Sequence, residues 1–124
     1  MHSRWLGAAG EVIASRYLRE HGYQIRTANE RSHFGEIDII AENKSYIVFV
    51  EVKTRSRLSL YLPREAVTKE KQKRIIRTAL LYLKRHKTKK QPRFDEIEIM
   101  MSEQLMKPEK VEHIIDAFDA GGFV

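Results

Sequence analysis

Residues 35–53, GEIDIIAENKSYIVFVEVK, constrain the fold more than any other part of this 124-residue chain. Two runs rich in Ile, Val and Phe, residue types that suit a pleated and buried strand, flank a short polar segment. That segment is Asn43-Lys44-Ser45, whose side chains are typical of a tight turn. The stretch therefore predicts two paired strands, residues 35–40 and 46–53, joined by this turn.

The charged residues of these two strands stand in unusually apolar surroundings. Because alternate strand residues point to one face, Glu51 and Lys53 lie together, and hairpin pairing would bring Asp38 beside them. Two carboxylates held close resist joint ionisation, and a divalent cation would remove that cost. The alternative is a pair of half-exposed strands with ordinary cross-strand ion pairs.

The remaining chain alternates helix-type and strand-type hydrophobic patterns, without a repeat or a low-complexity segment. Besides the two strands above, we predict helices at 3–21 and 69–87, strands at 23–28, 94–101 and 111–118, loops at 29–34 and 54–62, and a basic linker at 87–92. In strand 94–101 the acids Glu96 and Glu98 alternate with apolar residues, which predicts one exposed face. The order α-β-β-β-α-β-β predicts one α/β domain, 1–124, whose mixed, mostly antiparallel sheet of four or five strands is flanked by helices.

The first predicted helix carries two charged residues at or within its apolar stripe. The stripe consists of Trp5, Leu6, Ala9, Val12, Ile13 and Tyr17. Arg16 falls inside it, and the pattern gives no reason for a charge there. Glu11 lies at its margin beside small and apolar residues, so it is a better candidate for an inward-directed acid than Glu20, although an ordinary surface glutamate is the commoner explanation. Gly7 and Gly10 weaken a helix but allow another backbone to approach closely.

The second predicted helix begins after Thr68, a residue type that favours the N-cap position. Its apolar stripe consists of Ile75, Ile76, Ala79, Leu80 and Leu83. One turn earlier this stripe reaches Lys71 and Gln72. These two side chains are therefore predicted to point inward at the helix N-terminus, where anions are favoured.

Charge is unevenly distributed along the chain, whose formal net charge is +6. Residues 64–93 contain twelve Lys or Arg and two Glu, whereas residues 94–124 contain two Lys and eight acids. A basic block beside a carboxylate site favours an anionic polymer as partner, although a solvated helix face is the commoner explanation of such blocks. Because cysteine is absent and the five histidines are scattered, the sequence predicts neither a disulfide nor a zinc site. Without a long apolar run or a signal-peptide pattern, the sequence predicts a cytoplasmic protein with no membrane contact.

Asp38, followed after a turn by Glu51-Val52-Lys53, resembles the core motif of the PD-(D/E)xK nucleases. Over nearly its whole length the chain is similar to the YraN-like bacterial family of predicted endonucleases, which resemble archaeal Holliday junction resolvases. The matching segments are Gly7, Gly10-Glu11, Ala14, Tyr17-Leu18, Gly22-Tyr23, Asn29-x-Arg31, Gly35-Glu36-Ile37-Asp38, Val48 to Lys53 with Arg55, Glu65-Ala66-Val67, Lys71, and His113-x-x-x-Ala117-Phe118. The resemblance implies a restriction-endonuclease-like core.

The resemblance also implies four catalytic residues, Glu11, Asp38, Glu51 and Lys53. Asp38, Glu51 and the carbonyl of Val52 would hold Mg²⁺, or Mn²⁺ in its place. Glu11 would join directly, through water, or at a second metal. Lys53 would orient the attacking water or offset charge in the transition state of phosphodiester hydrolysis.

Further residues are predicted to surround this site. Glu36, on the same strand face as Asp38, would support the metal ligands. Contacts to phosphates are predicted for Arg31, Arg55, Lys71 and Arg74. For Arg31 an ordinary surface position is an equally good interpretation.

Three functions are compatible with these patterns. The first is a metal-dependent endonuclease of DNA, with branched DNA as a candidate substrate. The second is a non-catalytic nucleic-acid-binding protein that retains the nuclease fold. The third is an adaptor that docks another protein through the 56–62 loop and the acidic C-terminal segment. By analogy with the resolvases, a homodimer is an expectation for the nuclease.

Overall fold

The computed structural model describes residues 2–56, 67–102 and 107–121, with the side chains of residues 2–6 left aside. The elements in chain order are α1 (His2–Glu20), β1 (Gln24–Ser32), β2 (Gly35–Glu42), β3 (Tyr46–Ser56), α2 (Lys69–Arg85), β4 (Gln91–Met101) and β5 (Pro108–Phe118). This order is the one that the sequence predicted. The predicted loop at 56–62 lies, apart from Ser56, outside the described residues.

The five strands form one sheet in the order β1-β2-β3-β4-β5. All neighbouring strands pair antiparallel except β3 and β4, which are parallel. The predicted mixed, mostly antiparallel sheet is therefore confirmed, with β1 at one edge. Because β3 and β4 are parallel, the chain has to cross over between them, and α2 lies in that connection.

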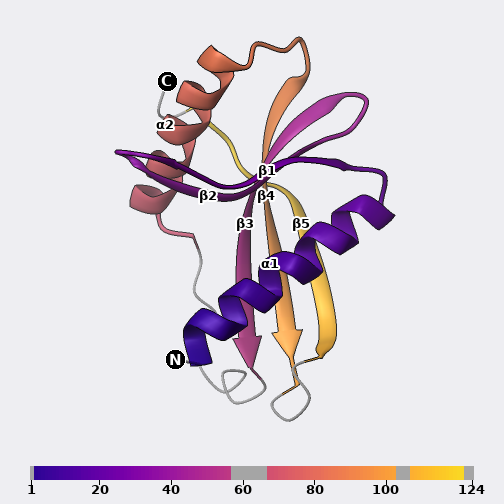
Figure 1. The fold of residues 1–124 in the computed structure, drawn as a ribbon. Coiled ribbons are helices and arrows are strands. Elements are labelled where there is room, and N and C mark those ends of the chain that lie inside the picture. Colours follow the sequence, from indigo (N-terminus) through magenta and orange to yellow (C-terminus); the bar gives the residue numbers. More distant parts are fainter. Residues whose placement is uncertain (1, 57–66, 103–106, 122–124) are drawn as a thin grey trace.

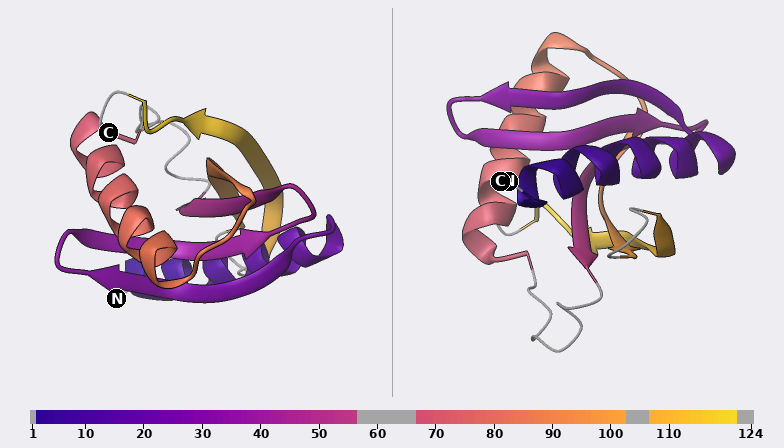
Figure 2. Two further views of the ribbon diagram at one scale, coloured as in Figure 1. Left: turned by 90° about the horizontal axis from the view of Figure 1, so that it is seen from above. Right: turned by 60° about the horizontal axis from the view of Figure 1, so that its bottom comes forward.

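The two helices cover opposite faces of the sheet (Figure 1), so each half of the core has its own helix. Alternate residues of β3 divide between them. Phe49 packs with the α2 side, whereas Val48 and Val50 pack with the α1 side. Seen from above, the sheet lies between the helices, and the β1–β2 hairpin projects alongside α2 (Figure 2).

The buried stripes of both helices are rotated relative to the predicted ones. Among residues 7–20 of α1 the buried positions are Gly10, Ala14 and Leu18, while Val12 is 63% exposed and Arg16 is also exposed. The charge at Arg16 is thus explained, because the residue does not lie in the stripe. In α2 the predicted stripe residue Leu80 is 46% exposed, and the stripe turns towards Tyr82.

Several strands are longer than predicted. β1 continues through the polar residues 29–32 because they pair with β2 out to Ser32↔Gly35. β3 continues to Ser56 because its ladder with β4 continues to Met101. β4 begins at Gln91, in the segment predicted as a linker. Pro92 is tolerated there because β5 pairs with β4 only from Phe94 onward, so the missing N–H removes no bond to β5.

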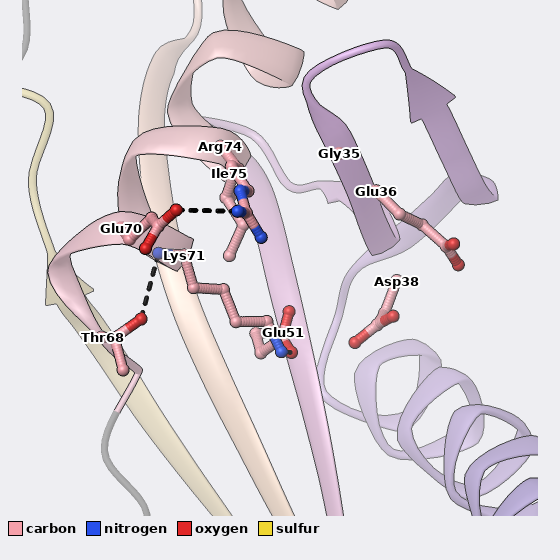
Figure 3. A pocket seen from close by; sticks show the side chains of 9 residues that line it. All are labelled: Gly35, Glu36, Asp38, Glu51, Thr68, Glu70, Lys71, Arg74 and Ile75. Carbon is pink, nitrogen blue, oxygen red and sulfur yellow. Dashed lines mark hydrogen bonds and ion pairs between the residues drawn. The ribbon is translucent and has the colours of Figure 1, made fainter.

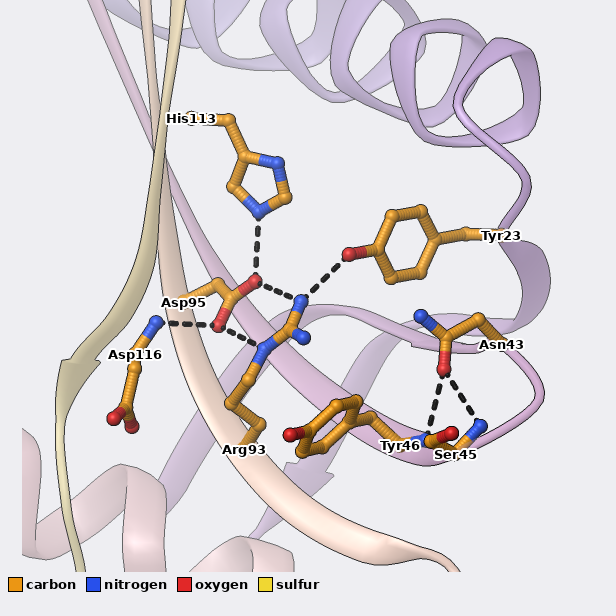
Figure 4. Close-up of polar contacts among 8 residues, drawn as sticks. All are labelled: Tyr23, Asn43, Ser45, Tyr46, Arg93, Asp95, His113 and Asp116. Carbon is orange, nitrogen blue, oxygen red and sulfur yellow. Dashed lines mark hydrogen bonds and ion pairs between the residues drawn. The ribbon is translucent and has the colours of Figure 1, made fainter.

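Two predictions from local sequence signals are confirmed, the turn at Asn43 and the N-cap at Thr68. The Asn43 side chain accepts hydrogen bonds from the N–H groups of Ser45 (3.0 Å) and Tyr46 (2.8 Å), which closes the β2–β3 turn (Figure 4). Thr68 caps α2, and its hydroxyl accepts from Lys71 N–H at 3.1 Å. Among the described residues no helix is both long and apolar enough to span a membrane.

A buried polar cluster around Asp95 ties β4 to β5 and to Tyr23, the residue before β1 (Figure 4). Asp95 is fully buried, and its carboxylate accepts two bonds from Arg93, at 2.9 and 2.8 Å. His113 Nε2 lies 2.7 Å from it, and Asp116 N–H donates to it at 3.0 Å. Arg93 also donates to the Tyr23 hydroxyl at 2.6 Å. Both carboxylate oxygens of Asp95 thus accept hydrogen bonds, as a buried carboxylate requires.

Candidate functional site

The candidate site lies where β2 separates from β3. The β2–β3 ladder extends only as far as Ile39↔Val50, whereas β2 stays paired with β1 to its first residue, Gly35. Asp38 and Glu51 are the first residues beyond the last β2–β3 pair, one on each strand. Val52 N–H donates to Asp38 Oδ2 at 2.8 Å and holds that carboxylate against β3.

A pocket of about 530 Å³ opens at this separation, between the two strands and the first turns of α2 (Figure 3). It is lined by Gly35, Glu36, Asp38, Glu51, Thr68, Glu70, Lys71, Arg74 and Ile75. The carboxylates of Asp38 and Glu51 lie on its strand side, and Lys71 and Arg74 reach it from α2. The structure thus places the two predicted acids in one pocket, as the hairpin argument required.

The pKa of Asp38 is raised to about 7 in this setting. Burial of the carboxyl contributes most, and the negative charge of Glu51 adds to it, as does that of Glu11. The Val52 N–H and the Lys71 ammonium oppose this shift. The pocket therefore holds acids whose joint ionisation is costly until a cation compensates them.

Glu11 approaches this pair from α1 because of a glycine next to it. A Cβ built on Gly10 would overlap the Thr54 hydroxyl of β3, so α1 can lie this close to the sheet only with glycine at that position. Gly7, three residues earlier and so slightly less than one turn away, has nothing within 4 Å of a Cβ built on it. The expectation of a close backbone approach is confirmed for Gly10 but not for Gly7.

Glu11 does not complete a three-residue ligand set. Within the described part of the chain, no group of three or more His, Cys, Asp or Glu side chains lies close enough together to hold one metal ion. Of the three predicted acids, Asp38 and Glu51 line the pocket, and Glu11 is not among its lining residues. Val52 contacts Asp38 through its N–H, and metal binding by its carbonyl stays a prediction.

Lys71 points inward, as predicted, and occupies the space beside the buried acid. Its ammonium lies 2.5 Å from Glu51 Oε1, and only 6% of the Glu51 side chain is exposed. Burial disfavours the charged ammonium, but the contact with Glu51 outweighs burial and raises the pKa of Lys71. Gln72 also turns inward, and its side chain donates to the Val67 carbonyl at 2.9 Å.

Two acids of β4, Glu96 and Glu98, belong to this region and were misassigned from the sequence. They were predicted on an exposed face, yet they are only 7% and 8% exposed because β4 lies between β3 and β5. Parallel pairing places Glu96 opposite Glu51, and Glu98 opposite Lys53. The signal that could have identified them is this register, which becomes visible only once β3 and β4 are known to be neighbours.

Lys53 lies beside this second acidic pair, opposite Glu98. The pKa of Glu96 is raised to about 7, first by burial and then by its hydrogen bond with Glu98, while Lys53 lowers it. Lys53 is not among the residues lining the pocket. Of the predicted convergence of Asp38, Glu51 and Lys53, the two acids face the pocket, whereas Lys53 lies two residues further along β3, opposite Glu98.

The remaining predicted site residues are dispersed around the pocket. Glu36 lines it, but its carboxylate is directed away from Glu51 (Figure 3) and pairs with Arg31 at 3.2 Å. Arg74 lines the pocket and pairs with Glu70 at 2.8 Å. Arg55 lies on β3 opposite Met100, not in a loop as predicted, and is not a lining residue of this pocket.

Comparison with known proteins gives a consistent result. The model of a family described as "Uncharacterised protein family UPF0102" matches residues 10–99. A UPF0102 protein of Caldanaerobacter subterraneus subsp. tengcongensis is 44% identical over 119 residues, covering 95% of this chain and 98% of the relative. One of Rhodococcus opacus is 44% identical over 120 residues, covering 94% and 98%. One of Chlorobium phaeobacteroides is 46% identical over 121 residues, covering 93% and 94%.

Proposed function

This chain belongs to the UPF0102 family, as its resemblance to YraN-like proteins predicted, and from its pocket we propose that it is a metal-dependent endonuclease that hydrolyses phosphodiester bonds of DNA. One observation carries the proposal. Asp38 and Glu51, from two separating strands, face one pocket in which the pKa of Asp38 is raised to about 7. Perturbed acids that converge in a pocket are typical of functional sites.

The donor set of this pocket fits Mg²⁺, with Mn²⁺ as the substitute. Mg²⁺ prefers oxygen ligands and is usually held by one or two carboxylates, with waters and substrate phosphates completing its shell. Asp38 and Glu51 supply that number, so the lack of a three-residue cluster among the described residues is no obstacle. When bound, such an ion lowers the pKa of a bound water and stabilises charge on the phosphoryl oxygens.

The chain's own residues would prepare the pocket for a phosphodiester. Val52 N–H fixes the Asp38 carboxylate, and burial keeps Glu51 away from competing waters. Lys71 and Arg74 give the α2 side of the pocket positive charge. Since phosphate contacts position a substrate without reading its sequence, these two residues favour a backbone-directed enzyme. Two residues that do not line the pocket are proposed to assist. Lys53 would act on the reacting water, and Glu11 on the charge of Asp38.

Cleavage of DNA tests this proposal directly. A panel of linear, flapped, four-way-junction and single-stranded DNA would be incubated with Mg²⁺, Mn²⁺ or EDTA. The wild type is expected to cleave at least one of them only with metal. Asp38→Asn and Glu51→Gln should each lower the rate about 100-fold or more, since each removes an anionic ligand.

Glu20→Gln is the matched control, because Glu20 is an exposed acid at the end of α1, away from the pocket. Its rate should equal that of the wild type. Circular dichroism and thermal melting would establish that all three variants are folded. Equal rates in the Asp38, Glu51 and Glu20 variants, or cleavage undiminished in EDTA, would refute the assignment.

A second candidate, a nucleic-acid-binding protein without cleavage activity, is favoured by one observation. Lys71 already contacts Glu51, so part of the negative charge is compensated without a metal. Such a protein would bind DNA equally well in Mg²⁺ and in EDTA, and would leave every DNA of the panel intact.

A further inference from the structure

A second cavity, of about 430 Å³, adjoins the acidic pocket and has a different chemical character. Its lining residues are Phe34, Lys69, Glu70, Lys73, Arg74 and Arg77. Glu70 and Arg74 also line the acidic pocket, so the two cavities lie side by side along α2. One aromatic ring and four cationic side chains thus form a surface that leads away from the acids.

The aromatic ring is held in place by the docking of the β1–β2 hairpin tip on α2. The Ser32 hydroxyl lies 2.8 Å from the Thr78 hydroxyl, and it accepts a hydrogen bond from Phe34 N–H at 3.1 Å. A Cβ on Gly35 would lie only 3.1 Å from Arg74 Cβ, which shows how closely the hairpin approaches the helix. Phe34, only half-buried, is therefore fixed at the cavity before any ligand arrives.

Three of the cationic side chains beside this ring are available to bind an anion. The Arg77 guanidinium carbon lies 5.4 Å from the Phe34 ring centroid, a cation–π geometry. Arg77, Lys69 and Lys73 are exposed, and within the described part of the chain none of them pairs with a carboxylate. Arg74, by contrast, pairs with Glu70. Exposed cations next to a fixed aromatic ring are the arrangement used to bind single strands.

We propose that this second cavity binds an unpaired nucleotide, with its base stacked on Phe34 and its flanking phosphates on Lys73 and Arg77. The inference rests on the proposed function and specifies its substrate class: a nucleic acid with unpaired nucleotides beside the bond to be cut. The ring centroid of the exposed His33 lies 4.0 Å from that of Phe34, so a base would stack on Phe34 in place of His33. In a duplex the base faces are covered by neighbouring bases, so only an unstacked base could take this position. Duplex binding would need the cations alone.

Binding in EDTA tests this inference without requiring cleavage. The probes are a fluorescent 12-nucleotide oligothymidylate and a 12-base-pair duplex, titrated by anisotropy at low salt. Phe34→Leu keeps apolar volume but has no ring, and should weaken oligothymidylate binding about tenfold, in line with the cost of losing one stacked base. It should leave duplex binding nearly unchanged. Phe34→Tyr, which keeps a ring, should bind both probes as the wild type does.

Lys73→Gln is the control for the purely electrostatic contribution. It should weaken the binding of both probes alike and reduce the salt dependence of binding by the amount expected for about one lost phosphate contact. Equal effects of Phe34→Leu on both probes, no effect on either, or no binding of oligothymidylate by the wild type would overturn the inference, and Phe34 would then be only the anchor of the hairpin tip.

The outcomes separate this inference from the nuclease proposal. Binding of oligothymidylate that depends on Phe34, together with an absence of cleavage in the metal panel, would refute the nuclease proposal and retain the cavity as a binding site. Cleavage that depends on Asp38, with no effect of Phe34→Leu on binding, would retain the nuclease and refute the stacking role.

Discussion

At the scale of single residues, Lys71 links the two charges that define the pocket. Its ammonium contacts Glu51 and lowers the pKa of Asp38, so it occupies the position of a built-in counter-ion. A divalent cation that binds these acids has to compete with it. Because Lys71 is half exposed and belongs to the first turn of α2, it can move aside without disturbing the core.

Lys71→Met is therefore expected to tighten Mn²⁺ binding in the absence of DNA, by about tenfold, since a competing positive charge is removed. The same variant should bind DNA more weakly. Mn²⁺ binding would be followed by electron paramagnetic resonance. Lys73→Met is the matched control on the exposed side of α2, and it should weaken DNA binding while leaving Mn²⁺ affinity unchanged. An unaltered Mn²⁺ affinity in Lys71→Met would show that Lys71 does not compete for the acids.

At the scale of elements, the position of α1 on the sheet depends on one glycine. Gly10 allows the helix backbone to meet Thr54, and Glu11 is thereby brought within electrostatic reach of Asp38. The buried Thr54 hydroxyl has no hydrogen-bond partner within the described part of the chain, which fits a contact made for proximity rather than for polar bonding.

Gly10→Ala should lower the free energy of unfolding by about 1–3 kcal/mol, as overpacking typically does. Gly7→Ala, in the same helix but in open space, should instead be neutral or stabilise by up to about 1 kcal/mol, the difference in helix propensity. Urea denaturation measures both. Similar losses in the two variants would contradict the close approach at Gly10.

The same elements show what sequence patterns can predict. Strand and helix types, their order and the Asn43 turn follow from local periodicity and turn chemistry, which the sequence contains in full. The exposure of Val12 and the burial of Glu96 do not, because they depend on which elements become neighbours. Asp38 and Glu51 could be paired from the sequence because a hairpin sets its own register. The position of Glu96 opposite Glu51 could not, because a parallel pairing across a helix leaves no local signature.

At the scale of the whole molecule, buried acids with opposite pKa shifts shape the stability of the metal-free protein. Asp38 and Glu96 have pKa values raised to about 7 from 3.8 and 4.5. Between those values the folded protein retains protons that the unfolded chain releases, so stability falls as the pH rises from about 4 to about 7. The pKa of Asp95 is lowered by His113 and Arg93 despite its burial, so its contribution is lost as the pH falls below about 4.

In EDTA the melting temperature is therefore expected to be lower at pH 8 than at pH 5, by about 4 °C or more. The double variant Asp38→Asn/Glu96→Gln should remove most of this difference, whereas Asp119→Asn, at an exposed acid, should not. Scanning calorimetry across this pH range provides the measurement. A wild-type protein that becomes more stable between pH 5 and pH 8 in EDTA would show that these acids are ionised without cost.

The parallel ladder between β3 and β4 also has a consequence for how the protein is made. Each β3 residue pairs with the residue 45 positions later, as Glu51 does with Glu96. During translation the hairpin that carries Asp38 and Glu51 can form early. The strand that pairs with β3 on its other side, β4, can form only after residues 91–101 have been synthesised. Closing so long a loop is slow compared with forming a hairpin. Glu51 can therefore meet Glu96 only after β4 has been made, and a nascent chain stopped before Gln91 would leave β3, the middle strand of the sheet, as an open edge.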